Sequence, residues 1–252
     1  MMGFKVTVLG SSGGYPGAGR ACSGYLFQNA EGNLVVDLGS GALANLLEHV
    51  RPDGLGGLAL THMHYDHYVD IYGLCTARRF WEKEVDPLPL LAPPHASEVI
   101  TSPLQAGSRE EFMRSLDLRG VRPGVPQGIA GFDIVALPAA HGAIDSLIYR
   151  ISRDGKVVCY SGDTDLCAAL VEQARGADLF ICEATFTSQV RNRMQGHLFA
   201  AEAGEAAAEA GVGTLLLTHL WPTLSGDRAL EDARSSFDGK VELAAEGMAI
   251  EL

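Results

Sequence analysis

Short runs of apolar residues recur along the chain, and most of them end at a polar or glycine-containing turn. Several runs carry no alternating polar positions, which is typical of strands with both faces buried. We predict strands at Lys5 to Leu9, Tyr25 to Gln28, Leu34 to Asp37, Leu58 to Thr61, Phe132 to Leu137, Leu147 to Ile151, Val157 to Tyr160, Leu179 to Cys182 and Thr214 to Thr218.

Between these runs the apolar positions recur with helical spacing. We predict helices at about Ala42 to His49, Asp66 to Phe80, Ala168 to Ala174, Leu198 to Ala210 and Asp227 to Phe237. Buried strands that alternate with helices predict an α/β fold of two packed, mixed sheets with helices on the outside, a four-layer αββα sandwich. A length of 252 residues suits one domain spanning 1–252.

Two segments lack clear periodicity. Glycines and prolines interrupt the segment from Glu98 to Gly131, so we expect a mobile connection or lid with one short helix at most. The loop from Gly10 to Arg20 follows a strand but ends without the Lys-Ser/Thr of a phosphate-binding P-loop. We expect it to be a flexible turn at the rim of the site.

The composition limits the binding partners and the cellular location that we expect for this chain. A net charge of −12 opposes broad binding to nucleic acid backbones, which requires clustered Lys and Arg, so extended nucleic acid is not expected as a partner. No apolar stretch approaches the length of a membrane span, and the start carries no secretion signal, so a cytoplasmic location without membrane contact is expected. Five scattered cysteines without a C-x-x-C pair are expected to be reduced and mostly buried.

The strongest chemical signal is the segment His62-Met63-His64-Tyr65-Asp66-His67, which follows a predicted strand directly. In extended backbone, side chains two residues apart point the same way, so His62 and His64 can bind one cation. The following turn can direct Asp66 and His67 toward a second cation. The alternative, a solvated polar turn, would suit a single histidine better than four potential ligands in six residues.

Three further candidates each lie just beyond a predicted strand: His141, Asp163 and His219. Taken singly they could be a core histidine or a turn residue, but together they complete two coordination shells. Imidazole and carboxylate ligands without thiolate suit Zn²⁺, Mn²⁺ or Fe²⁺, and the two oxygens of Asp163 could bridge two ions. We expect two divalent metal ions, zinc in the first place.

The segment THMHYDH resembles the H-x-H-x-D-H signature of the metallo-β-lactamase superfamily, and His141, Asp163 and His219 fall at its later motif positions. Within that superfamily the chain is most similar to the phosphodiesterase branch of ribonuclease Z and cyclic-nucleotide phosphodiesterases, through LGSSGGYP, VVDLGSGA, SGDT, CEATF, GH and LTH. This resemblance implies that Asp37 supports the metal ligands from behind, and that a homodimer is possible.

The same resemblance implies contact between Glu183, which ends a strand, and His197, which precedes a helix. A carboxylate that holds one imidazole nitrogen leaves the other available as a proton donor. We therefore expect Asp66, Glu183 and His197 to be the catalytic residues, with a metal-bound hydroxide held by Asp66 attacking phosphorus and His197 protonating the leaving oxygen. Alternatively, Glu183 and His197 are ordinary polar residues near a helix start.

A charge count favours a phosphodiester monoanion: two divalent ions contribute +4, Asp66 and Asp163 remove 2, and hydroxide removes 1, which leaves +1. By resemblance, ribonuclease Z carries a long arm for transfer RNA between the positions of His141 and Asp163. Here 21 residues separate them, and they contain a predicted hairpin turning at Arg153-Asp154-Gly155. We therefore expect a small phosphodiester, in the first place a cyclic nucleotide.

Three other functions stay open on the sequence. A hydrolase of the same fold could cleave a lactone, thioester or β-lactam, because a two-metal hydroxide also attacks carbonyl carbon. A catalytically inactive protein could bind nucleotides or other partners. A ribonuclease Z-like nuclease could act on the ends of RNA or of single-stranded DNA, with grip supplied by a dimer or a second protein.

Overall fold

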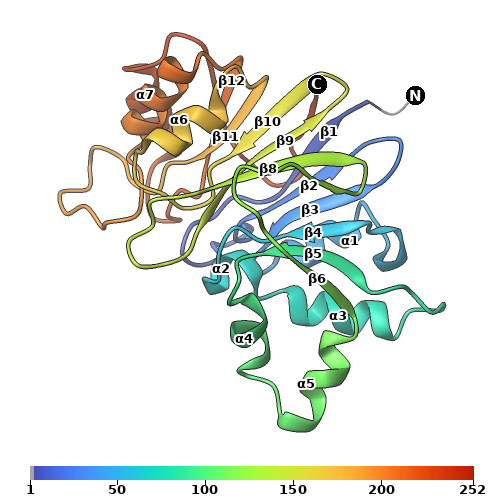
Figure 1. Cartoon of the computed structure of the whole chain (residues 1–252). Helices are drawn as coiled ribbons and strands as arrows, with labels where there is room; N and C mark the ends of the chain where they lie inside the picture. The colour runs from blue at the N-terminus through green and yellow to red at the C-terminus, as the bar shows by residue number, and fades with distance from the viewer. Residues whose placement is uncertain (1–2) are drawn as a thin grey trace.

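Residues 3–252, which the computed structural model describes, form two mixed sheets of seven strands that pack face to face (Figure 1). The first sheet consists, in spatial order, of β14 (Ala249–Glu251), β1 (Lys5–Gly10), β2 (Gly24–Gln28), β3 (Asn33–Leu38), β4 (Gly57–Ala59), β5 (Leu88–Ala92) and β6 (Leu116–Gly120). The second consists of β13 (Lys240–Leu243), β12 (Thr214–Thr218), β11 (Leu179–Glu183), β10 (Lys156–Tyr160), β9 (Leu147–Arg153), β8 (Phe132–Pro138) and β7 (Gln127–Ile129).

The inner faces of the two sheets share one apolar core. The ring of Phe4, just before β1, lies 5.0 Å from that of Phe132 in β8, and Tyr25 in β2 lies 4.8 Å from Tyr160 in β10. These aromatic side chains are fully or almost fully buried, so the contacts join the two sheets through their apolar core.

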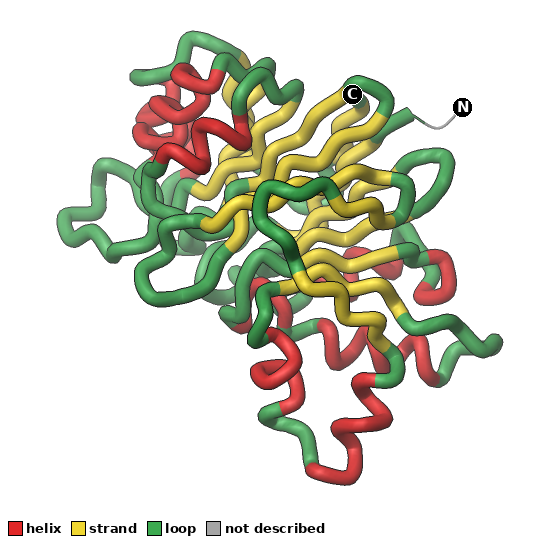
Figure 2. The backbone as a smooth tube through the Cα atoms, in the orientation of Figure 1, coloured by secondary structure: helices red, strands yellow, loops and turns green. Residues whose placement is uncertain are grey.

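Helices cover both outer faces, as Figure 2 shows, which completes the predicted αββα order. Over the first sheet lie α1 (Ala42–Leu47), the short 3-10 helix η1 (Pro52–Gly54), α2 (Tyr65–Tyr68), α3 (Ile71–Arg79), α4 (Ala96–Thr101) and α5 (Ala106–Met113). Over the second lie α6 (Ala168–Ala174), α7 (Ala200–Ala210) and α8 (Gly226–Arg234). None of the helices in residues 3–252 has the length and apolar content that crossing a bilayer requires.

The nine predicted strands are present within a few residues, but β5, β6, β7, β13 and β14 were not predicted. β5 contains Pro89 and is flanked by further prolines, and such a sequence is typical of a turn. It is nevertheless a strand, which pairs with β4 and β6. The segment from Glu98 to Gly131, expected to be irregular with one short helix at most, contains the end of α4 and the short helix α5, and also the strands β6 and β7, which were not expected. Most positions of β6 are exposed or half-buried, because β6 is an edge strand, and this removes the apolar run that would have revealed it.

The predicted helix from Asp66 to Phe80 is divided into α2 and α3. The break lies at Asp70, whose backbone N–H donates to Leu38 O and whose carboxylate accepts from the N–H of Leu43 at 2.9 Å. These bonds tie the helix to β3 and α1 and interrupt its own hydrogen-bond ladder. All five cysteines are free thiols, and only Cys167 is partly exposed.

The predicted hairpin at Arg153-Asp154-Gly155 is confirmed. Arg153 pairs with Lys156 across β9 and β10, which leaves a two-residue turn at Asp154 and Gly155. Both turn residues have positive φ, 51° and 79°, as a type I′ turn requires. The segment between His141 and Asp163 thus consists of two paired strands and short connections.

Candidate metal centre

The predicted site residues follow the ends of strands that meet at one edge of the sandwich. In the first sheet β3 and β4 are parallel, and in the second β10, β11 and β12 are parallel, so their carboxyl ends lie together. The structure brings all nine side chains into one region, all buried except the half-buried His64: His62, His64, Asp66, His67, His141, Asp163, Glu183, His197 and His219.

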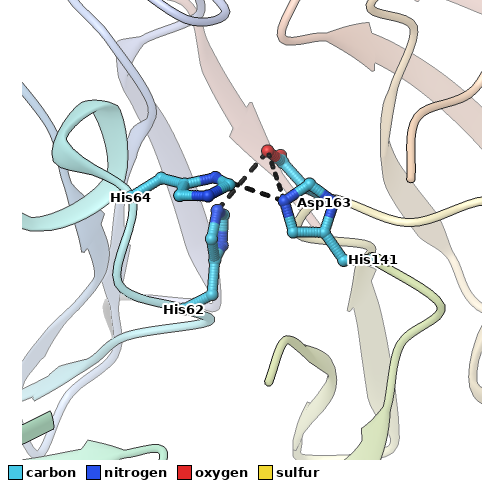
Figure 3. A group of neighbouring side chains, drawn as sticks. All are labelled: His62, His64, His141 and Asp163. Atoms are coloured by element: carbon cyan, nitrogen blue, oxygen red, sulfur yellow. Dashed lines mark hydrogen bonds and ion pairs between the residues drawn. The ribbon is translucent and has the colours of Figure 1, made fainter. Parts of the chain in front are cut away.

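The first group of ligand atoms comes from His62, His64, His141 and Asp163, which all point toward one another in Figure 3. Nε2 of His62 lies 3.5 Å from Oδ2 of Asp163, and Nε2 of His141 lies 3.2 Å from Nδ1 of His64. Burial lowers the pKa of His62 and of His64, so both rings are neutral and can donate a lone pair. Nε2 of His62 is buried and has no hydrogen-bond partner among residues 3–252, as a vacant ligand atom would.

The second group comes from Asp66, His67, His219 and the other oxygen of Asp163. Nε2 of His67 lies 3.2 Å from Nε2 of His219, 3.6 Å from Oδ2 of Asp66 and 3.2 Å from Oδ1 of Asp163. Nε2 of His219 lies 3.1 Å from Oδ2 of Asp66 and 3.5 Å from Oδ1 of Asp163. A tetrahedral zinc site with bonds of about 2.0–2.1 Å has ligand atoms about 3.4 Å apart, so these spacings fit one metal ion.

Asp163 therefore belongs to both groups, with Oδ2 in the first and Oδ1 in the second. Its Oδ1 is buried and accepts no hydrogen bond within residues 3–252. A buried carboxylate oxygen without a donor is costly unless a cation lies beside it. The geometry is that of a carboxylate that can bridge two cations.

The electrostatics of the second group also favour a cation. Burial lowers the pKa of His67, but the charges of Asp163, Asp66 and Asp37 outweigh burial and hold the pKa well above its usual value. Burial likewise raises the pKa of Asp163, but the charges of His219 and His67 hold it well below its usual range. The carboxylates stay ionised, and a metal ion can displace the proton that His67 would otherwise carry.

The nitrogen atoms that face away from the two groups are held by the protein. Nδ1 of His67 lies 2.7 Å from Oδ2 of Asp37, and Nδ1 of His141 donates to the carbonyl of Gly196 at 2.7 Å. Metal-binding histidines typically have such partners, because these fix the ring and its tautomer. Asp37 itself has a positive φ of 55°, which places its carboxylate behind the ligands at a backbone cost.

The glycine-rich loop after β1 contacts the second group. The N–H of Gly14 donates to Oδ2 of Asp66 at 2.7 Å, and a Cβ on Gly13 would lie 2.8 Å from Nδ1 of His219. The loop expected at the rim of the site thus packs directly on two of the predicted ligands.

Glu183 and His197 are in contact beside the second group. Nδ1 of His197 lies 3.3 Å from Oε1 of Glu183, and the ring of His197 is stacked parallel to that of His219 at 5.7 Å between centroids. Nδ1 of His197 is also 3.9 Å from Asp163, so His197 could be considered a ligand. That nitrogen faces Glu183 and Thr185, whereas Nε2 makes no hydrogen bond within residues 3–252, which suits a proton donor better than a ligand.

Sequence reasoning missed several residues that support the site. Thr61 and Thr185 contact ligand histidines, and Gly196 supplies the carbonyl for His141. The only signal for the threonines was their proximity to His62 and Glu183 in sequence. Gly196 has a φ of 90°, a conformation that favours glycine. A glycine directly before His197 was therefore the one sequence signal that the backbone is constrained at this position.

Substituting Gly39 with alanine is expected to lower the free energy of unfolding by about 2–3 kcal/mol, because overpacking forces backbone shifts. A Cβ at Gly39 would lie 1.9 Å from the backbone oxygen of Asp66, which is in α2 beside the predicted ligands. Gly107 in α5 is the control, because its Cβ would meet nothing within 4 Å and alanine favours a helix. Urea unfolding midpoints test this, and a Gly39→Ala protein as stable as Gly107→Ala would contradict it.

Comparisons with known proteins agree with this geometry. The family model described as beta-lactamase superfamily domain matches residues 33–220. The chain is 35% identical to the protein Rv1339 of Mycobacterium tuberculosis over 96% of this chain and 89% of the relative. It is 32% identical to the probable metallo-hydrolase YhfI of Bacillus subtilis, over 97% and 98%, and 30% identical to ribonuclease Z of Mycolicibacterium gilvum, over 95% and 93%. The crystal structure of YhfI matches with a TM-score of 0.88 at 32% identity, covering 98% of this chain and 99% of YhfI.

Proposed function

This chain belongs to the beta-lactamase superfamily and is a metallo-hydrolase, and we propose that it is a phosphodiesterase for small substrates, in the first place cyclic nucleotides. One observation carries the proposal: the ring of His197, held at Nδ1 by Glu183, lies 4.9 Å from the ring of His141 and 5.7 Å from that of His219, and its Nε2 makes no hydrogen bond within residues 3–252. A proton donor at that position suits an alkoxide leaving group, which needs a proton when its bond to phosphorus breaks.

The proposed cofactors are two divalent metal ions, zinc in the first place, with manganese or iron as alternatives. His62, His64 and His141 would hold one ion, Asp66, His67 and His219 the other, and Asp163 both. Bound there, the ions would acidify a water toward a pKa of about 7 and withdraw charge from the phosphoryl oxygens.

The protein residues then have separate roles. Asp66, fixed by the N–H of Gly14, orients the attacking water toward phosphorus. The water releases one proton to solvent, its oxygen bonds to phosphorus as the bond from phosphorus to the leaving oxygen breaks, and Nε2 of His197 gives its proton to that leaving oxygen. Glu183 accepts from Nδ1–H of His197 and keeps that nitrogen protonated. After the reaction, Nε2 of His197 takes up one proton from solvent.

Two features support a small substrate. The connection between His141 and Asp163 is largely used by β9, β10 and their two-residue turn, so it has no long extension that could grip folded RNA. The net charge of −12 disfavours a long polyanion but leaves a small monoanion free to reach a locally cationic centre. The similarity to ribonuclease Z favours RNA ends as the second candidate substrate.

A hydrolysis panel on metal-loaded protein tests the proposal. It compares cyclic mononucleotides, bis-nitrophenyl phosphate, short RNA, a lactone and nitrocefin. We expect the highest kcat/KM on a cyclic nucleotide, since its monoanion suits the charge of the centre and its size suits a site without an arm. Activity confined to the lactone or nitrocefin would overturn the phosphodiesterase proposal, and a clear preference for RNA would transfer it to the ends of nucleic acids.

Changing Glu183 to Gln is expected to move the alkaline limit of activity to lower pH by about one unit or more. Burial lowers the pKa of His197, but the hydrogen bond and charge of Glu183 raise it to about 9, so the donor is protonated below that pH and lost above it. Without the carboxylate the donor loses its proton at lower pH. The measurement is kcat against pH, with Glu172→Gln on the exposed surface as the control. An unshifted alkaline limb in Glu183→Gln would exclude this role.

A further inference from the structure

Two buried threonines in the site make the same pair of contacts. Oγ1 of Thr61 lies 2.8 Å from Oδ2 of Asp37 and 3.0 Å from Nδ1 of His62. Oγ1 of Thr185 lies 2.6 Å from Oε2 of Glu183, 2.8 Å from Nδ1 of His219 and, as a third contact, 3.2 Å from Nδ1 of His197. Each hydroxyl thus lies between a carboxylate and a histidine, once just after β4 of the first sheet and beside the first metal group, and once just after β11 of the second sheet and beside the second group.

The direction of the hydrogen bonds at Thr185 follows from the proton count. Oε1 of Glu183 accepts from the N–H of Thr164 at 2.7 Å, and Oε2 accepts from the N–H of Leu198 at 3.1 Å. Both oxygens act as acceptors, and an ionised carboxylate has no proton to give. The single hydrogen of the Thr185 hydroxyl therefore points to Glu183, and its oxygen must accept from Nδ1–H of His219.

The same count holds at Thr61. Oδ1 of Asp37 accepts from the N–H of Thr61 at 2.8 Å, and Oδ2 accepts from the hydroxyl of Tyr160 at 2.8 Å and from Nδ1–H of His67 at 2.7 Å. A hydroxyl donates more strongly to a carboxylate than to a neutral ring, so the Thr61 hydrogen also points to the acid. Its oxygen then accepts from Nδ1–H of His62. In both histidines the proton is on Nδ1, and the lone pair of Nε2 faces the metal group.

We propose that Thr61 and Thr185 are positioning residues that set the tautomer and ring orientation of His62 and His219 by relaying the charges of Asp37 and Glu183. Because neither threonine is exposed to solvent, water cannot readily replace the hydroxyl. Glu183 consequently supports two histidines, His219 through Thr185 and His197 directly. The same arrangement of carboxylate, threonine and histidine thus supports both metal groups, although one follows a strand of the first sheet and the other a strand of the second.

The proposal rests on the metal centre of the proposed function, but not on the identity of the substrate. Its tests read ring tautomer and metal affinity, which remain measurable if no phosphodiester is hydrolysed. It can therefore fail while the hydrolase activity stands, and the phosphodiesterase proposal can fail while this one stands.

The first test needs no substitution in the relay. Side-chain ¹⁵N shifts of the metal-free protein at mildly alkaline pH, assigned by single His→Gln variants, report which nitrogen of each neutral ring carries the proton. We expect the Nδ1–H form for His62 and His219. Finding Nε2–H as the main form of either ring would overturn the relay at that residue.

The second test compares Thr61→Val, Thr185→Val and the two serine variants by competition with a metal chelator. Valine has the shape of threonine without the hydroxyl, so each valine variant should bind metal about 10–100-fold more weakly at its own group, and serine should restore most of the affinity. Thr7 is the matched control, because its hydroxyl is buried and has no hydrogen-bond partner within residues 3–252. Wild-type affinity in both valine variants, or equal loss in Thr7→Val, would contradict the proposal. If a valine variant does not fold, the tautomer measurement and the serine variant still decide.

Discussion

Changing Asp163 to Asn is expected to reduce hydrolysis by at least about 10³-fold, because it removes the carboxylate that reaches both metal groups. Asparagine keeps the size of the side chain but offers one neutral oxygen and an amide that would point hydrogens toward a ligand position. Loss of a negative charge that is buried among histidines also removes much of the attraction for divalent cations.

The measurement is metal content per chain together with turnover. Asp154→Asn is the control: this carboxylate is exposed at the hairpin turn, and asparagine tolerates its positive φ of 51°. The control should keep wild-type metal content and rate. If the Asp163→Asn protein retained full metal content and rate, the shared carboxylate would not be needed.

The second large effect is expected at His197. Changing it to Ala should leave metal content intact but lower turnover of a cyclic nucleotide by about 10²–10⁴-fold, the usual contribution of a general acid. The loss should be much smaller on bis-nitrophenyl phosphate, since nitrophenolate departs without a proton. This difference separates proton donation from a general disturbance of the site, which would slow both substrates.

His49→Ala, at an exposed position after α1, is the control for the loss of a histidine. An equal loss on both substrates would assign His197 to metal binding or to packing against His219. Loss of metal content would favour the same assignment, because His197 also lies near Asp163.

Much of the candidate site could be predicted because its proposed ligands follow strands whose apolar runs are continuous. Residues 62–67 form one continuous segment that follows β4 and enters α2, and His141 and His219 each follow a strand predicted within a residue or two. Parallel strands bring such ends to one edge, so the sequence order of strand and ligand already implied their meeting. The αββα layers follow from the same alternation of buried strands with helices, and the structure confirms them.

The parts that could not be predicted depend on tertiary contacts. The edge strands β6, β7 and β14 are short or exposed, and their apolar pattern is set by a single covered face. The break at Asp70 depends on partners in β3 and α1 that are distant in sequence. Thr61 and Thr185 acquire their roles only because Asp37 and Glu183 lie within hydrogen-bond distance after folding. No local pattern marks a threonine as a relay.

Two groups of side chains, joined by Asp163, are proposed to bind two divalent cations. Anomalous diffraction at a metal absorption edge, on crystals of protein loaded with zinc or manganese, tests this most directly. Two peaks are expected, one among His62, His64 and His141 and one among Asp66, His67 and His219, with Asp163 between them. Absence of any peak there, or peaks only at surface carboxylates, would contradict it.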